Sequence, residues 1–423
     1  MHILVVGAGL SGLLASLELL ERGHRLTIVE AASAPCRGAS FSMASTTGNL
    51  RPFLPIEPLS LGERLKRRVG SEAGALRYGA KEALRAQSFL KTAAAKSTPE
   101  HAAAARSFAA LMSTRANRLL TDLMNRFALG GERSIGLMHI YEAEDAKRPE
   151  APQPMGSESA LSADYARAAQ PMLPDELTLE HVIFNPDGAT FSASLLAREA
   201  KEVLQKHPAC EIRCGTRVAG LIEHGGRVCG VRTSSGDLEA DVVLAAPGAG
   251  ALDILHESAL GSDTAAALAP VTRLMLSAER REAAQHTPVG LVFNDTAIAA
   301  PVGESIRICG PWYLGSADDI EKESGYKALW SIAMRFLPES ADWNKGRYLA
   351  QTVLAASDGL GLVGASRLPG LSLSIAGGFH GADFCALYAK LAALSVLGEP
   401  PEGPDAEFAE ALSPMRFESR FSI

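Results

Sequence analysis

Residues 1–30 of this chain read MHILVVGAGLSGLLASLELLERGHRLTIVE, and this stretch decides the fold. The apolar run at residues 2–6 predicts a buried parallel strand, and the leucines at helical spacing between residues 13 and 20 predict a helix after it. A second apolar run at residues 26–29 predicts another strand. Strand, helix and strand in this order form a βαβ unit, whose two strands lie parallel in one sheet.

Three glycines and an acid give this unit the fingerprint of a dinucleotide site. Gly7 permits a tight turn out of the strand, Gly9 lets the backbone approach a pyrophosphate, and Gly12 lets the helix pack closely on the sheet. The helix start directs free N–H groups at the phosphates. Glu30 is placed to bind the ribose hydroxyls of an adenosine, and its charge disfavours a 2′-phosphate. We therefore expect FAD or NAD rather than NADP.

The length and composition of the chain are consistent with an enzyme that acts on small molecules. The chain has 423 residues, enough for more than one domain, and its net charge of -7 is mild and spread out, so we expect no nucleic acid partner. No apolar run reaches membrane-spanning length, and the strand at the N-terminus leaves no room for a signal peptide, which together predict a cytoplasmic protein. The six cysteines are scattered, and they complete neither a metal site nor a redox disulfide.

The middle of the chain alternates between types of structure. Small residues at 31–51 predict a loop that lines the diphosphate, and residues 59–127 have the composition and spacing of a helical insert. Strands are expected at residues 134–141 and 172–183, the second ending in a turn at Asn185-Pro186-Asp187-Gly188.

The chain then returns to the nucleotide domain. An antiparallel patch is expected across residues 217–242, followed by a parallel strand that ends in Pro247-Gly248-Ala249-Gly250. Gly248 and Gly250 lack a third glycine and an acid partner, so only one nucleotide site is predicted. With no second site for a nicotinamide, we expect the organic substrate itself to supply the electrons.

Two later stretches are candidates for the active site. Residues 306–313 alternate like a strand and end in Trp312 and Tyr313, which are either walls of a pocket or core residues. Near the C-terminus, a strand at residues 371–376 leads into Gly377-Gly378-Phe379-His380-Gly381, and a helix is expected from Ala382 to Gly398. A helix start there would stabilise the negative charge that develops on a reduced flavin.

These motifs together resemble the D-amino-acid oxidase and dehydrogenase superfamily of FAD enzymes, and the order is most similar to bacterial D-amino-acid dehydrogenases. The resemblance rests on VVGAGLSG (5–12) with Glu30, ASFSMAS (39–45), VVLAAPGA (242–249), SDGLGLVG (357–364), LSLSIAGGFHG (371–381) and LAALSVLG (391–398). It implies an α/β fold with a Rossmann-like FAD-binding domain of the glutathione-reductase type, an antiparallel β-meander, and an α+β substrate or cap domain.

The resemblance also implies domain boundaries and site residues. Residues 1–58, 184–262 and 349–423 are expected to form the FAD-binding domain, and residues 59–183 and 263–348 the cap. FAD is expected to contact Gly7, Gly9, Leu10, Ser11, Gly12, Glu30, Ala31, Arg37, Ala39, Ser40, Ser42, Met43, Val218, Ala246, Gly248, Gly378, Phe379 and Gly381. Substrate contacts are expected from Thr46, Arg307, Tyr313 and Gln351, and His380 is the catalytic candidate, with a structural role as the alternative.

The reaction implied is oxidation of a C–N bond in an amino acid or amine by hydride transfer to flavin N5, which gives an imine. Reduced flavin would pass its electrons to oxygen or a quinone. One feature departs from the family: the strand before the Asp358-Gly359 turn usually supplies an arginine that binds the substrate carboxylate, and residues 351–356 contain none. A flavin-dependent hydroxylase or tailoring enzyme acting on a larger metabolite or a carrier-bound residue therefore stays open, as does a flavoprotein subunit without activity of its own.

Overall fold

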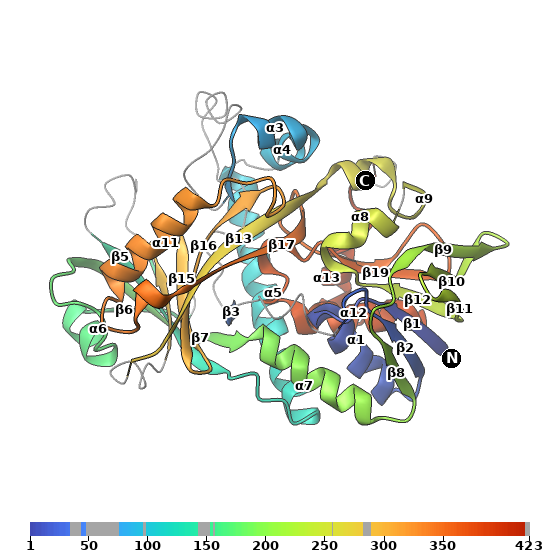
Figure 1. The fold of residues 1–423 in the computed structure, drawn as a ribbon, viewed down its shortest axis with the longest axis horizontal. Helices are drawn as coiled ribbons and strands as arrows, with labels where there is room; N and C mark the ends of the chain where they lie inside the picture. Colours follow the sequence, from blue (N-terminus) through green and yellow to red (C-terminus); the bar gives the residue numbers. More distant parts are fainter. Residues whose placement is uncertain are drawn as a thin grey trace.

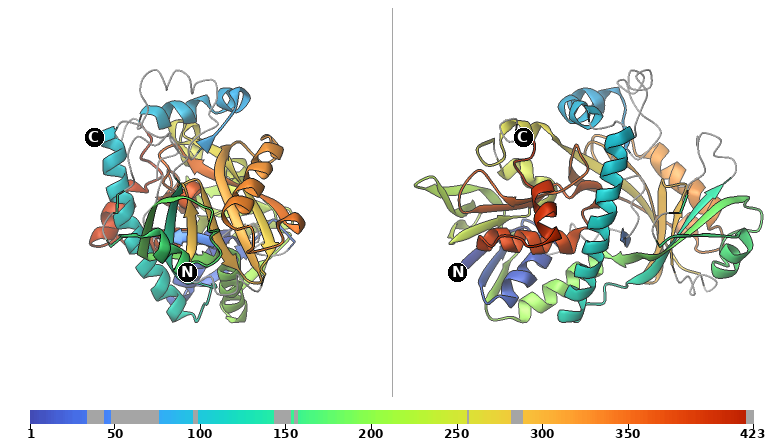
Figure 2. Two further views of the ribbon diagram at one scale, coloured as in Figure 1. Left: turned by 90° about the vertical axis from the view of Figure 1, so that its left-hand side faces the viewer. Right: turned by 180° about the vertical axis from the view of Figure 1, so that it is seen from behind.

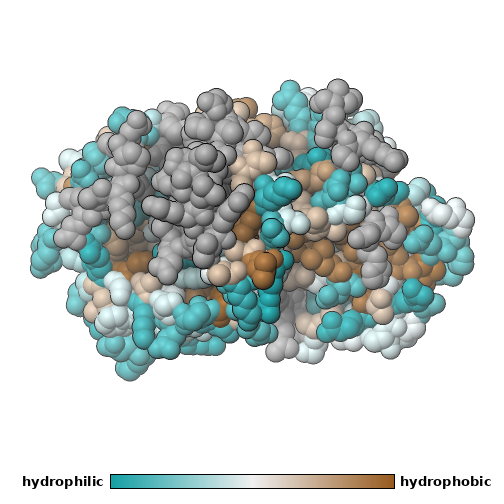
Figure 3. Space-filling view, turned by 90° about the horizontal axis from the view of Figure 1, so that it is seen from above, coloured by the Kyte–Doolittle hydropathy of each residue, from teal (hydrophilic) through white to brown (hydrophobic). Residues whose placement is uncertain are grey.

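The computed structural model of this chain describes residues 1–33, 44–47, 76–95, 99–142, 153–154, 157–255, 257–281 and 289–418. These residues form two halves, each built around a sheet (Figure 1). On the face seen from above, apolar side chains gather in patches between polar ones (Figure 3). No helix among the described residues is both long and apolar enough to cross a membrane.

The sheet of the first half is the one predicted from residues 1–30. Its six strands are, in spatial order, β18 (Leu362–Ala365), β19 (Leu371–Ile375), β12 (Val242–Ala245), β1 (His2–Val6), β2 (Arg25–Val29) and β8 (Cys210–Arg213). All neighbours are parallel except β18 and β19. In the central strand β1, Val6 pairs with both Val29 and Ala245, so three strands end together at one edge. Ligands of open parallel sheets bind beyond such an edge.

Both faces of this sheet are covered. One packs against three helices: α1 (Leu10–Glu21), α7 (Ala193–Lys206) and α12 (Cys385–Leu397). A fourth helix, α5 (Pro99–Arg126), packs on α12 in the same core. The other face packs against the meander β9 (Val218–His224), β10 (Arg227–Thr233) and β11 (Gly236–Glu239) and the short helix α8 (Ala251–Ile254). Central strands buried on both faces explain the unbroken apolar runs in the sequence.

The second half contains a ten-stranded sheet. Its main path is β17 (Arg347–Ala356), β13 (Leu268–Glu279), β16 (Ser305–Leu314), β15 (Ala297–Val302), β14 (Gly290–Phe293), β5 (Ser134–Glu142), β7 (Leu179–Ser192) and β3 (Ala44–Thr47), and β4 (Leu76–Arg77) and β6 (Ser159–Leu161) pair with β16 and β7. Helix α11 (Glu323–Phe336) packs on β13 and β16. The long strands β13 and β17 extend from this sheet toward the first half (Figure 1).

Short helices complete the described chain. They are α3 (Ala80–Arg85), α4 (Gln87–Ala95), α6 (Ala163–Ala169), α9 (Glu257–Leu260), α10 (Ser262–Ala266) and α13 (Pro404–Ala411), with 3-10 turns η2 (Gly248–Gly250), η4 (Trp343–Lys345) and η5 (Gly378–His380). Seen from behind, the long α5 runs between the two halves (Figure 2).

Helix α5 packs in the core of the first half. The boundaries at 58 and 183 placed it in the cap, but Met112, Ala116 and Leu120 are buried in the same core as Leu13 and Leu17 of α1. The division of the chain into domains remains a prediction. In its packing, however, α5 belongs with the nucleotide-binding sheet.

Two local predictions were wrong. Strand β7 continues through Asn185–Gly188, because Asn185 Oδ1 accepts the N–H groups of Asp187 and Gly188 at 3.0 Å each, which makes a bulge in the strand rather than a chain reversal. The last long helix begins at Cys385 rather than Ala382, because residues 378–380 form a separate 3-10 turn first.

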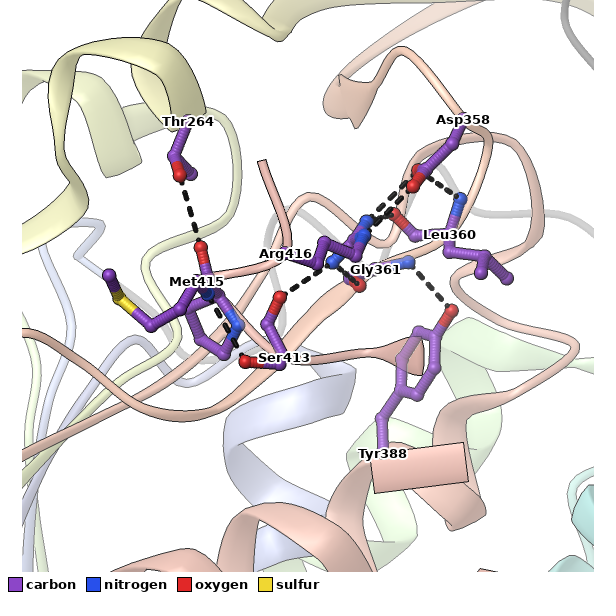
Figure 4. A network of polar contacts seen from close by, with 9 residues as sticks. Thr264, Asp358, Leu360, Gly361, Tyr388, Ser413, Met415 and Arg416 are labelled. Atoms are coloured by element: carbon purple, nitrogen blue, oxygen red, sulfur yellow. Dashed lines mark hydrogen bonds and ion pairs between the residues drawn. The ribbon is translucent and has the colours of Figure 1, made fainter. Parts of the chain in front are cut away.

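The end of the described chain folds back onto the Asp358-Gly359 turn. Arg416 donates to both carboxylate oxygens of Asp358 at 2.8 and 2.9 Å and to the carbonyl oxygens of Leu360, Gly361 and Ser413 (Figure 4). The hydroxyl of Tyr388 in α12 accepts the Gly361 N–H at 3.0 Å. These contacts fix the loop between β17 and β18 from two sides.

Candidate active site

The glycines of the first turn face different surroundings. Gly7 has φ +104°, and a Cβ there would lie 2.3 Å from the carbonyl oxygen of Ala246; a Cβ on Gly12 would lie 2.1 Å from the carbonyl oxygen of Gly7. At both positions, backbone oxygen atoms leave no room for a side chain. A Cβ on Gly9 would meet no heavy atom within 4 Å. The open side of this turn therefore fits the pyrophosphate of a dinucleotide, at the start of α1 beside Leu10 and Ser11.

Glu30 is fixed at the end of β2. Its carboxylate accepts the backbone N–H of Ala8 at 2.9 Å and that of Ala32 at 2.8 Å, and Ala31 between them is exposed. These bonds hold the carboxylate beside the glycine turn, at the end of the sheet where a ribose would lie. The residues present therefore fit the adenosine half of FAD.

The next parallel strand brings Ala246 and Gly248 to the same edge. Ala246 donates its N–H to Val6 at 2.8 Å, and Gly248 has φ +63° with open space where a Cβ would stand. The side chain of Val218, by contrast, is buried in the core beneath the meander. Strand β17 contacts both η2, which starts at Gly248, and η5.

The turn at residues 377–381 packs tightly against β17. Gly377 bridges to Ala355, Gly378 has φ +53°, and a Cβ on Gly378 would lie 2.8 Å from the Cβ of Ala355. A Cβ on Gly381 would lie 3.0 Å from the Gly377 backbone. Gly378 is glycine because β17 approaches the turn closely, and Gly381 is glycine because the backbone of the turn itself lies close to it.

His380 and Phe379 project from this turn with defined partners. His380 Nδ1 lies 2.9 Å from Asp383 Oδ2, and both side chains are largely buried. Phe379 meets Trp312 of β16 edge to face, with ring centroids 5.6 Å apart. The turn thus connects the first half to one face of the second sheet.

The predicted substrate residues do not all lie together on that face. Gln351 of β17 pairs with Arg273 of β13, and Arg273 pairs with Trp312, so the three side chains form one row on the Phe379 side. Arg307 pairs with Ser277, four residues further along β13, which is about 13 Å from this row. Burial first, and then the charge of Arg347, lower the pKa of Arg307.

Tyr313 lies on the opposite face. Its hydroxyl accepts a long hydrogen bond from Arg77 at 3.5 Å, and a Cβ on Gly325 of α11 would lie 2.8 Å from it. Of the aromatic pair at the end of β16, Trp312 therefore faces the 377–381 turn and Tyr313 faces α11. Thr46 lies in β3, at the other end of the sheet order from β17.

Part of the expected FAD site belongs to the segment that follows β2. Arg37, Ala39, Ser40, Ser42 and Met43 lie outside the described residues. The structure adds two residues that sequence did not select, Arg273 and Asp383. The one signal for Arg273 was a charge inside the apolar stretch of residues 268–278, and its pairing with Gln351 follows only from the register of β13 and β17.

Comparison with known proteins agrees with this geometry. The DAO family, described as FAD dependent oxidoreductase, matches residues 2–394. The chain is 24% identical over 228 residues to a D-amino acid dehydrogenase of Granulibacter bethesdensis; the match covers 53% of each, so it spans about half the length of that relative.

Solved structures show the same fold. The chain is similar to glycine oxidase from Geobacillus kaustophilus (18% identity, TM-score 0.65, 96% of this chain and 97% of that one) and to iminodiacetate oxidase from Chelativorans sp. BNC1 (18%, 0.66, 97% and 98%). It is also similar to L-proline dehydrogenase from P. horikoshii (15%, 0.66, 99% and 97%). The expected fold class and the FAD cofactor are confirmed, and the hydroxylase or tailoring alternative is not favoured.

Proposed function

Because the chain belongs to the DAO family of FAD-dependent oxidoreductases, we propose that it oxidises a C–N bond of an amino acid or amine to an imine. When bound, FAD supplies the acceptor for the electron pair. The observation that carries the proposal is the contact of the 377–381 turn with the sheet face of Gln351, Arg273 and Trp312. Glycine oxidase, iminodiacetate oxidase, L-proline dehydrogenase and D-amino acid dehydrogenase, the similar proteins, are named for substrates that contain a C–N bond.

The chain's own residues divide into two groups in this proposal. Gly7, Gly9, Glu30 and Gly248 bind and orient the cofactor at the carboxyl edge of the parallel sheet. The turn around Gly378 and the face of the second sheet enclose the substrate and exclude water from it.

His380 is the candidate for moving a proton. Its Nδ1 is held by the carboxylate of Asp383, which, as an acceptor, keeps the proton on Nδ1. A ring oriented in this way can take up or release a proton at Nε2. An amine has to lose its ammonium proton before its C–N bond is oxidised, and an imidazole beside it would accept that proton.

The test is a screen of the purified protein reconstituted with FAD and kept anaerobic. Glycine, D-alanine, proline, iminodiacetate and carboxylate-free amines are added in turn, and the visible flavin absorbance is followed. Bleaching by an amine or amino acid, with ammonia or a carbonyl product formed, supports the proposal. A flavoprotein that none of them bleaches and that NADPH does bleach would instead be a hydroxylase. Reoxidation of the bleached enzyme by oxygen or by a quinone identifies the electron acceptor.

A further inference from the structure

Arg273 is a charged side chain surrounded by protein, in the middle of strand β13. Its Nε donates to the Gly310 carbonyl oxygen at 2.9 Å, and its guanidinium lies over the Trp312 ring, 5.2 Å from the centroid. Arginine has five N–H donors, and within the described part of the chain only this one is used in a hydrogen bond. No carboxylate of the described residues lies within ion-pairing distance of it.

Such a cation is unusual because a charge removed from water is normally paired. Burial lowers the pKa of Arg273 to about 10, and the negative charge of Asp383 opposes part of that shift. The group is still a cation at neutral pH. Arg273 is half-buried by its accessible surface. Among the described residues, this cation therefore has no ion-pair partner.

The position of Arg273 indicates where that anion comes from. Arg273 lies directly opposite Gln351 on β17, and its Trp312 neighbour contacts Phe379 of the 377–381 turn. Asp383, the nearest acid that acts on it, is already bonded to His380. The free N–H groups thus lie between the second sheet and the turn beside which the substrate is oxidised.

We propose that Arg273 binds the carboxylate of the substrate, and that this chain therefore selects amines that carry a carboxylate over amines that do not. The inference rests on the proposed function. A planar guanidinium can hold a carboxylate through two parallel, charge-assisted hydrogen bonds. Stacking on Trp312 and the bond to Gly310 fix the orientation of the fork before the substrate arrives, which limits the entropy lost on binding.

The experiment compares amines with and without carboxylates: proline with pyrrolidine, which differ in one carboxylate, and iminodiacetate with diethylamine, which differ in two. Binding and reduction are followed by flavin absorbance in the wild type and in Arg273→Gln and Arg273→Lys. The dissociation constant of FAD is measured separately by fluorescence. Arg347→Gln is the control, because it removes an exposed arginine from the far end of the neighbouring strand β17.

We expect the wild type to prefer the carboxylate member of at least one pair. Arg273→Gln should weaken that member about 100-fold, Arg273→Lys about 10-fold, and neither should change the amine member or FAD affinity by more than about twofold. The Lys variant and the wild-type preference keep the test decisive if the Gln variant does not fold.

Three results would overturn the inference. The wild type could reduce its flavin with pyrrolidine or diethylamine as readily as with their partners, which would leave the proposed function intact while removing the role of Arg273. Arg273→Gln could lower FAD affinity and keep the selectivity, which would assign the guanidinium to the cofactor. Finally, Arg307→Gln could cause the loss of carboxylate binding in its place.

If no amine or amino acid reduces the flavin, the proposed function fails. Carboxylate binding is then read from the shift in oxidised flavin absorbance, and absence of any shift with proline or iminodiacetate overturns the inference as well.

Discussion

The three glycines of the first turn, Gly7, Gly9 and Gly12, are needed for two different reasons. Gly7 and Gly12 are small because backbone oxygen atoms stand 2.3 and 2.1 Å from where a Cβ would be. Gly9 has an ordinary backbone, with φ -82° and ψ -179°, and open space beside it. The first two are required by the fold, and we propose that the third leaves room for the FAD pyrophosphate.

A matched pair of alanine variants separates these reasons. We expect Gly9→Ala to keep the thermal midpoint of the FAD-free protein within about 2 °C and to weaken FAD binding at least about tenfold. Gly12→Ala should lower the midpoint of the same FAD-free protein by several degrees, since helix α1 must move off the sheet. Fluorescence titration with FAD and thermal unfolding measure the two effects. Equal FAD affinity in Gly9→Ala and wild type would exclude the pyrophosphate from this turn.

His380 makes a second prediction at this scale. His380→Asn places an amide where Nδ1 lies, so it keeps the contact with Asp383 and loses the Nε2 atom. We expect kcat about 100-fold lower, an altered pH profile and unchanged FAD content. The measurement is the steady-state rate between about pH 6 and pH 10, because this range covers the ordinary pKa values of histidine and of amines. A variant with the wild-type rate and profile would make the histidine structural.

Site residues could be predicted where they belong to a local sequence pattern. They could not be predicted where the alignment of distant strands brings them together. The Gly7, Gly9, Gly12 and Glu30 positions follow from a fingerprint within 30 residues. The row of Gln351, Arg273 and Trp312 joins three strands from distant parts of the chain, and no local signal specifies their alignment. Tyr313, adjacent in sequence to Trp312, faces the other side of the sheet because successive side chains of a strand alternate.

Among the elements, the C-terminal segment has a structural role that its sequence did not suggest. Residues 413–418 cross the loop between β17 and β18, where the Arg416 side chain makes five hydrogen bonds to Asp358 and nearby carbonyl groups (Figure 4). Asp358 is buried, so its charge depends on this partner. The loop that Arg416 holds follows directly on β17, the strand that contacts the 377–381 turn.

Replacing Arg416 by Met should leave the Asp358 carboxylate buried without its partner. We expect a loss of about 3–5 kcal/mol in the free energy of unfolding, measured with urea. Arg416→Lys keeps the charge but not the fork, and should lose less. If both variants unfold at the wild-type urea concentration, the segment does not hold the loop in solution.

Helices α5, α12 and α13 are joined by a second buried acid. Asp405 of α13 accepts from Arg115 of α5 at 2.7 Å and from Lys390 of α12 at 2.7 Å. Burial acts to raise the pKa of Asp405, but the hydrogen bonds from Arg115 and Lys390 outweigh it, and the net pKa is lowered.

A lowered pKa fixes the sign of a pH effect. The stabilisation by Asp405 is present above the pKa of an unfolded aspartate, about 3.9, and is lost as the pH falls through the lower pKa of the folded state. We expect Asp405→Asn to cost about 2 kcal/mol or more at pH 7 and progressively less below about pH 4. Urea unfolding of both proteins across this range gives the difference. A difference that stays constant into acid would mean that the carboxylate charge contributes nothing.

Element types were predicted well and their ends less well, for identifiable reasons. The βαβ unit, the meander and the strands of the second sheet are present, since their apolar patterns match their burial. The turn expected at Asn185–Gly188 is a bulge, because the same residues that reverse a chain can also widen a strand. The α5 helix was expected in the cap, and its position in the sequence does not reveal that its apolar face packs in the core of α1 and α12.

At the scale of the whole molecule, two halves meet along one line. The carboxyl edge of the parallel sheet supplies the glycine turn, Glu30 and Gly248, and the second sheet supplies the face of Gln351, Arg273 and Trp312. Strand β17 contacts η2 and η5, so it connects the two sets. An oxidised cofactor and its substrate would have to lie side by side where these parts converge.

Anaerobic titration of the FAD-reconstituted protein with an amino acid is the most direct test of this arrangement. We expect a yellow protein with one FAD per chain, whose visible absorbance is lost on addition of an amino acid and restored by an electron acceptor. A preparation that binds no FAD, or one that binds FAD and keeps its colour with every amine and amino acid tried, would contradict it.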